Sequence, residues 1–143
     1  MKTFCGPIKT CLRVSDDIDK GYSSFYAEVR RISHIVKHGQ KAEAPFLYLI
    51  DEIFRGTNNN ERFIGSEFVI KELAKSQKAL GFISTHDLEL TKLESEYQKL
   101  ANFHFRDDVS DNQLIFSYQI KDGPCPTTNA LKILKAEGLD VPV

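Results

Sequence analysis

Cysteine is scarce in this sequence. The 143 residues contain three cysteines, Cys5, Cys11 and Cys125, and none of them belongs to a C-x-x-C pair. Thiols that are so few and so scattered do not suit a disulfide framework, and without paired cysteines a zinc ribbon is not expected either. Free thiols in a reducing cytoplasm are the simplest interpretation.

Long apolar runs are also missing. The longest run spans residues 46–50, far short of the roughly 20 residues that a helix needs to cross a bilayer. The N-terminus shows no basic segment followed by an apolar one, which a secretory signal would require. We therefore expect a soluble, cytoplasmic protein with no membrane partner.

The sequence also lacks an excess of positive or of negative charge. Lys plus Arg number 19 and Asp plus Glu number 20, so the formal net charge is −1. This balance excludes a strongly basic body that coats nucleic acid by neutralising its phosphates. It leaves room for a local basic patch or for a separate DNA-binding partner.

The rest of the composition is typical of a folded domain. Hydrophobic residues make up 41% and charged residues 27% of the chain, as in ordinary globular proteins. The length fits one domain with a sizeable core.

The spacing of apolar residues switches repeatedly between a strand period and a helix period. In the first strand, Ile8 and Leu12 alternate with Lys9 and Cys11, which predicts a half-buried strand. The run at 46–50 predicts a strand buried on both faces. The predicted strands lie at 8–14, 46–50, 81–85, 101–105 and 114–120, with a polar turn at 107–112, and the predicted helices lie at 23–39, 64–78, 87–97 and 128–138.

Strands and helices therefore alternate along most of the chain. This order predicts the α/β class, with a mainly parallel sheet flanked by helices and an antiparallel edge hairpin formed by the last two strands. Gly39 is the expected end of the first helix. Ile64, Phe68 and Leu73 are the apolar residues that mark the second helix.

Two predicted strands end in residues that can carry chemistry. The strand at 46–50 is followed by Asp51 and Glu52, the pattern of a Walker B segment. There Asp51 would hold Mg²⁺ through its water shell, and Glu52 would deprotonate an attacking water. The alternative is a solvated strand end, since an acidic pair after an apolar run is common.

The strand at 81–85 is followed by His86 and Asp87. Ligands bind beyond the carboxyl ends of parallel strands, so His86 could reach a terminal phosphate if the two strands are neighbours. The alternative is that Asp87 caps a helix while His86 is a passive loop residue.

A third candidate is a turn that contains Gly21 and leads into a helix beginning with Ser23 and Ser24. A helix N-terminus offers free N–H groups and a positive dipole end to an anion. Simple N-capping by one of the serines explains the same residues. His34 and His38 have the i, i+4 spacing of a metal pair, but without an evident third ligand a solvated helix face is the better interpretation.

Taken in order, these segments resemble the ATPase domain of the MutS family over almost the whole chain. Residues 6–17 and 21–28 resemble its signature region, and residues 49–58, which read LIDEIFRGTN, resemble its Walker B segment running into the D-loop. Residues 84–86 resemble its switch-histidine motif, and residues 127–139 resemble its last helix.

The resemblance implies part of an ABC-type P-loop NTPase core that works as a homodimer with ATP and Mg²⁺. It implies that Asp51 serves the metal, that Glu52 is the catalytic carboxylate and that His86 contacts the γ-phosphate. It further implies a DNA mismatch repair or related protein, in which ATP hydrolysis drives a DNA-bound conformational change through DNA-binding segments that this chain lacks.

The same resemblance assigns residues to the dimer interface. Gly21, Ser23 and Ser24 would contact nucleotide held by the partner subunit, and Gly56, Thr57 and Asn58 would lie in the D-loop that crosses the interface. Tyr22, Phe54, Asn58 and Asn59 depart from the residues that are usual in the family. These departures favour a divergent MutS-related branch.

No phosphate-binding string of the form G-x-x-x-x-G-K-[ST] occurs in these residues. Residues 1–143 are therefore expected to be the C-terminal part of the ATPase domain, and the isolated chain to be inactive, with weak binding of Mg-ATP or none. The alternative is a non-catalytic dimerisation or regulatory module that presents a signature face to an intact ATPase. Another ABC-type ATPase and a metallohydrolase are weaker readings.

Overall fold

The computed structural model describes residues 5–12, 24–110, 113–126, 134 and 138. Strands and helices follow one another as the sequence predicts, which confirms the α/β class. The elements are β1 (Ile8–Cys11), α1 (Ser24–Lys41), β2 (Phe46–Ile50), α2 (Asn59–Lys75), β3 (Ala79–Ile83), η2 (Leu88–Lys92), α3 (Leu93–Glu96), β4 (Phe103–Ser110) and β5 (Gln113–Asp122). They fall into two compact units, residues 1–90 and 91–143.

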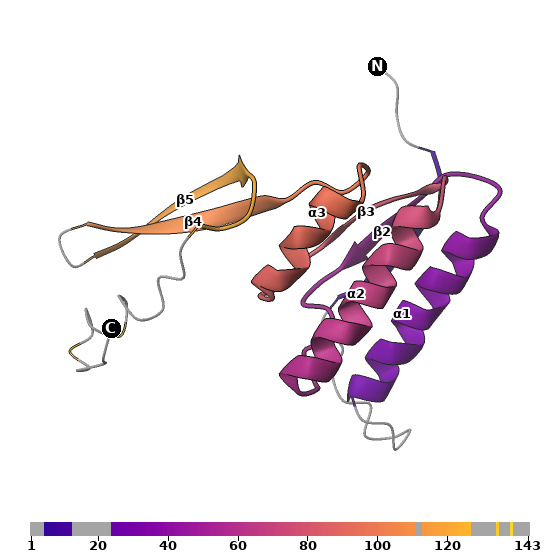
Figure 1. Cartoon of the computed structure of the whole chain (residues 1–143), viewed down its shortest axis with the longest axis horizontal. Coiled ribbons are helices and arrows are strands. Elements are labelled where there is room, and N and C mark those ends of the chain that lie inside the picture. The colour runs from indigo at the N-terminus through magenta and orange to yellow at the C-terminus, as the bar shows by residue number, and fades with distance from the viewer. Residues whose placement is uncertain (1–4, 13–23, 111–112, 127–133, 135–137, 139–143) are drawn as a thin grey trace. The chain divides into compact units, whose positions relative to one another are not determined.

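The first unit contains a parallel sheet with the strand order β1-β2-β3. Figure 1 shows α1 and α2 side by side against this sheet. Alternate residues of β2, namely Phe46, Tyr48 and Ile50, are buried in one cluster with apolar residues of both helices. This cluster includes Ile32 and Leu73, and it fixes the sheet against the helices.

The opposite face of the same sheet is apolar but open. Ile8, Leu80 and Phe82 are 58%, 62% and 62% exposed. The strand register aligns Ile8 with Leu47 and Leu47 with Leu80, so these side chains share a face. The prediction that the second strand is buried on both faces is therefore wrong, because α1 and α2 cover only one of them.

In the first strand, too, the apolar residues that mark the pattern do not lie on the face that the helices cover. Cys11 is 2% exposed and faces the core, whereas Ile8 and Leu12 are 58% and 50% exposed. Alternation in a strand says that two faces differ, but it does not say which face the helices cover. Burial also raises the pKa of the Cys11 thiol to about 11, so this free thiol stays protonated.

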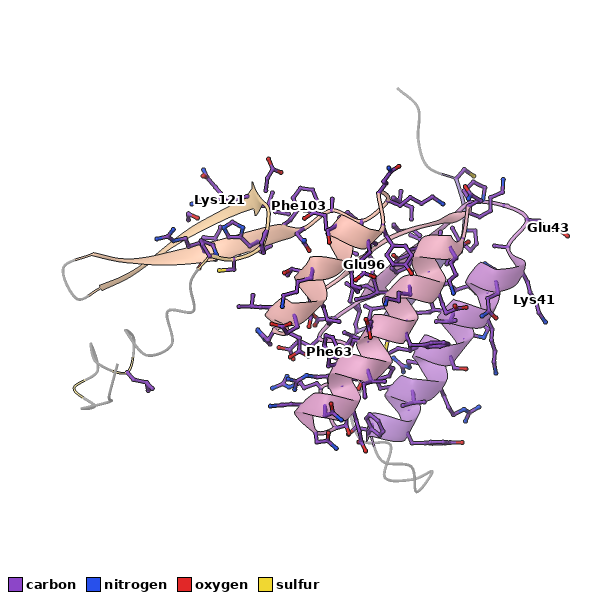
Figure 2. All side chains as sticks on the ribbon, in the orientation of Figure 1. Lys41, Glu43, Phe63, Glu96, Phe103 and Lys121 are labelled. Atoms are coloured by element: carbon purple, nitrogen blue, oxygen red, sulfur yellow. The ribbon has the colours of Figure 1, made fainter. Side chains whose placement is uncertain are left out.

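The helices differ from their predictions in face and in length. Ile64 and Phe68 are 56% and 59% exposed, while Val69 and Leu73 are buried. Gly39 does not end α1, which continues to Lys41 (Figure 2). Gly39 is buried, and a Cβ there would lie 3.4 Å from the Leu73 side chain, an ordinary contact distance.

Two further helices also differ from their predicted bounds. Helix α2 ends at Lys75 and not at Lys78. The helix expected at 87–97 is divided into the 3₁₀ segment η2 and the single turn α3. None of the helices that the structure describes has the length and hydropathy of a membrane span.

The second unit contains the predicted hairpin, β4 paired antiparallel with β5. The pairing makes it a two-stranded sheet separate from the parallel one. The turn is shorter than predicted, because β4 continues to Ser110 with a register shift between Phe105 and Asp107. The helix predicted at 128–138 falls almost entirely outside the described residues.

Candidate functional site

The candidate site lies where β2 and β3 end. These strands are parallel neighbours, and their last residues, Ile50 and Ile83, are paired in register. The segments that follow them therefore start from the same edge of the sheet. This edge brings together Asp51, Glu52 and His86, as the sequence analysis required for a common site.

Ser84 connects the two strand ends. Its hydroxyl donates a hydrogen bond of 2.7 Å to Oδ1 of Asp51 and accepts one of 2.7 Å from the backbone N–H of Glu52. Its own backbone N–H donates to the carbonyl of Ile50 at 2.9 Å. Ser84 thus orients both acidic residues, a role that the sequence analysis missed.

Glu52 meets two basic side chains. Its Oε1 lies 2.9 Å from Nε2 of His86, and its Oε2 accepts a hydrogen bond of 2.7 Å from Nη1 of Arg55. The hydrogen bond from His86, together with the charge of Arg55, lowers the pKa of the Glu52 carboxyl below its ordinary value. The carboxylate is therefore ionised at neutral pH, the state in which it can accept a proton.

The segment after His86 is held by an ion pair with α2. Asp87 accepts hydrogen bonds of 2.8 and 3.1 Å from the guanidinium of Arg62, and this bond lowers the pKa of Asp87. The Asp87 side chain therefore pairs with Arg62 and does not act as the helix cap that was the alternative prediction. The pair anchors the backbone next to His86.

The predicted D-loop residues lead into α2. Asn58 is the N-cap of this helix, and its side chain accepts a hydrogen bond of 2.9 Å from the backbone N–H of Glu61. Thr57 donates a bond of 2.6 Å to the Glu61 carboxylate. Gly56 lies against Phe25, with 3.2 Å between its ideal Cβ position and the Phe25 Cβ. The side chains of Thr57 and Asn58 thus both bind Glu61 in the first turn of α2, and these bonds stabilise the start of the helix.

The signature segment is described only in part. Ser24 is the first residue of α1, while Gly21 and Ser23 lie outside the described residues.

The two histidines of α1 lie in different surroundings. His34 is exposed, whereas the ring of His38 packs edge-on against Phe46, with 4.7 Å between ring centroids. The described residues contain no cluster of three or more acidic, histidine or cysteine side chains that could hold a metal ion.

The oxygen donors at the site nevertheless suit Mg²⁺. Mg²⁺ keeps much of its water shell and is usually bound through one or two carboxylates together with phosphate oxygens. Asp51 is exposed at the strand end, and the Ser84 hydroxyl orients one of its oxygens. A site of this kind needs a nucleotide to complete the coordination.

A parallel α/β sheet with an Asp-Glu pair and a histidine at two adjacent carboxyl ends, where ligands of such sheets bind, is consistent with part of a nucleoside triphosphatase core. Residues 3–143 match the family model of MutS domain V, the ATPase domain. The chain belongs to the MutS family. The comparison confirms the resemblance found in the sequence.

Proposed function

We propose that this chain supplies the catalytic carboxylate and the signature helix of a MutS-type ATPase dimer. The observation that carries the proposal is the convergence of Asp51, Glu52, Ser84 and His86 at one edge of the sheet. In this proposal residues 1–143 are the C-terminal part of the ATPase domain, and ATP binding and hydrolysis are coupled to a conformational change of the DNA-bound protein.

Each side chain has a separate task in the proposed reaction. Glu52 accepts a proton from the attacking water. Asp51 would hold Mg²⁺, which would offset charge on the phosphates, and Ser84 orients this carboxylate. His86, 85% exposed, contacts the γ-phosphate.

The second half of each site comes from the other subunit. In the proposed dimer, Gly21, Ser23 and Ser24 contact nucleotide held by the partner, and the backbone N–H groups at the start of α1 favour an anion. Gly56, Thr57 and Asn58 contribute to the dimer interface. The DNA-binding surfaces lie outside these residues.

The test is the Glu52→Gln variant in the ATPase dimer that contains these residues. Loss of a general base lowers hydrolysis by about 10²–10⁴-fold, whereas nucleotide binding is expected to stay within about twofold. Steady-state turnover and equilibrium binding of ATP measure the two effects. Glu43→Gln is the matched control, because Glu43 is an exposed glutamate in the loop before β2.

Unimpaired turnover of Glu52→Gln would refute the role of Glu52. It would leave the non-catalytic dimerisation module as the better reading of the chain.

A further inference from the structure

Glu28 makes a contact that the proposed reaction does not yet use. It lies in the second turn of α1, and its Oε1 accepts a hydrogen bond of 2.6 Å from the backbone N–H of Phe54. The two residues are 26 positions apart in the sequence. This bond therefore ties α1 to the turn that follows the Asp-Glu pair.

The turn has an uncommon backbone conformation. Glu52 and Phe54 have φ values of 50° and 55°, in the left-handed region that side chains other than glycine disfavour. Such conformations persist only where the surrounding structure holds them. The geometry of the catalytic carboxylate thus depends on contacts made by its neighbours.

Aromatic packing accompanies the hydrogen bond. The rings of Phe25 and Phe54 have centroids 6.4 Å apart. Gly65 of α2 lies beneath the Phe54 ring, so close that a Cβ there would come within 3.0 Å of the ring carbons. Phe25 of α1 also contacts Gly56, so residues of both α1 and α2 pack against the turn.

Glu28 and Phe25 are three residues apart and so lie on one face of α1. Glu28 is half-buried, and burial raises the pKa of its carboxyl while the Phe54 N–H lowers it. Partial burial of a carboxylate is costly unless a donor compensates it. The Phe54 amide supplies this compensation.

We infer that Glu28 is a positioning residue for hydrolysis, which acts by fixing the Phe54 amide and with it the turn that carries Glu52. The inference rests on the proposed role of Glu52. Because Ser24 begins the same helix, Glu28 also joins the surface proposed to meet the partner's nucleotide to the carboxylate of its own site.

The experiment compares Glu28→Ala, Glu28→Asp and Glu28→Gln in the ATPase dimer. Alanine removes the acceptor and aspartate withdraws it by one methylene, so both are expected to lower kcat by about tenfold to a hundredfold, with KM within twofold. Glutamine keeps an acceptor oxygen at the same reach and is expected to restore kcat. Glu43→Ala is the control. Figure 2 labels Glu43, which lies beyond the C-terminal end of α1.

Hydrogen exchange of the Phe54 amide is the readout that does not depend on catalysis. It is measured by NMR on the chain itself. Exchange is expected to speed up at least tenfold in Glu28→Ala and Glu28→Asp, and to stay near the unmodified rate in Glu28→Gln and Glu43→Ala. Glu28→Asp keeps a carboxylate in place and serves if the alanine variant does not fold.

Two results would overturn the inference. Unchanged Phe54 exchange in both shortened variants would remove the hydrogen bond as the cause. Faster exchange with normal kcat would remove the positioning role, while a loss of turnover in Glu52→Gln would still support the proposed function. Normal turnover in Glu52→Gln, in contrast, would count against the proposed function, and the positioning role of Glu28 would fall with it.

Discussion

Single hydrogen-bonding residues turn two strand ends into one site. Ser84 is the clearest example, because one hydroxyl contacts the Asp51 carboxylate and the Glu52 backbone at 2.7 Å each. The sequence shows a serine near the end of the strand predicted at 81–85, but it does not show which carboxylate lies opposite. That hydroxyl, close to the predicted strand end, was the available signal.

The pair of Asp87 and Arg62 leads to a prediction about pH. Arg62 holds the pKa of Asp87 below its ordinary value, so the stabilisation is complete above the unfolded pKa of about 4 and is lost as the pH falls through the lower folded value. The free energy of unfolding falls when the pH is lowered from about 5 to about 2.5. In Asp87→Asn this fall is expected to be smaller by about 1 kcal/mol.

Urea unfolding at the two pH values measures this difference. Glu43→Gln removes a carboxylate that lies in an exposed loop and is expected to leave the pH dependence nearly unchanged. An identical loss of stability in Asp87→Asn and in the unmodified chain would show that the pair does not stabilise the folded state.

At the scale of helices and strands, periodicity identifies elements better than it identifies their buried faces. The run at 46–50 and the stripe of α1 lead directly to β2 and to a long helix. The apolar pair Ile64 and Phe68 marks α2 correctly as a helix but points to the wrong face, because both are exposed. Which face is buried depends on where the sheet lies, and local spacing does not contain this information.

Gly81 leads to a prediction about the sheet. A Cβ at this position of β3 would overlap the backbone carbonyl oxygen of Tyr48, and a backbone atom in a paired strand cannot easily move. Gly81→Ala is therefore expected to destabilise the first unit by about 3 kcal/mol or more.

The matched control is Gly39→Ala in α1. There the added Cβ would meet the side chains of Leu73 and Phe46 at 3.4 Å, an ordinary contact distance. Alanine also favours a helix over glycine by up to about 1 kcal/mol, so this variant is expected to be as stable as the unmodified chain or more stable. Equal urea midpoints for the two alanine variants would contradict the steric argument.

At the scale of the whole molecule, the open face of the parallel sheet is the main feature. It combines Leu80 and Phe82, each 62% exposed, with β1 and β3 as the edge strands of the described sheet. Exposed apolar surface and unpaired strand edges both favour association between chains. The chain is therefore expected to self-associate as its concentration rises.

Size-exclusion chromatography with light scattering tests this expectation. Leu80→Lys combined with Phe82→Lys is expected to lower the apparent mass toward that of a monomer, because the charges oppose contact between sheet faces. Gln77→Lys adds a charge at an exposed position outside the strand and is expected to have little effect. A monomer at every concentration in the unmodified chain would show that the open face does not drive association.

The sequence by itself determined the class of fold, the family and the order of the motifs. These depend on local patterns, such as an apolar strand followed by Asp51 and Glu52, which neighbouring residues make recognisable. Only the tertiary structure decided that Ser84 contacts the acidic pair, that Glu28 binds the Phe54 amide in the turn after it, and that one face of the sheet is open. These contacts depend on strand register and helix placement, which bring together residues far apart in the chain.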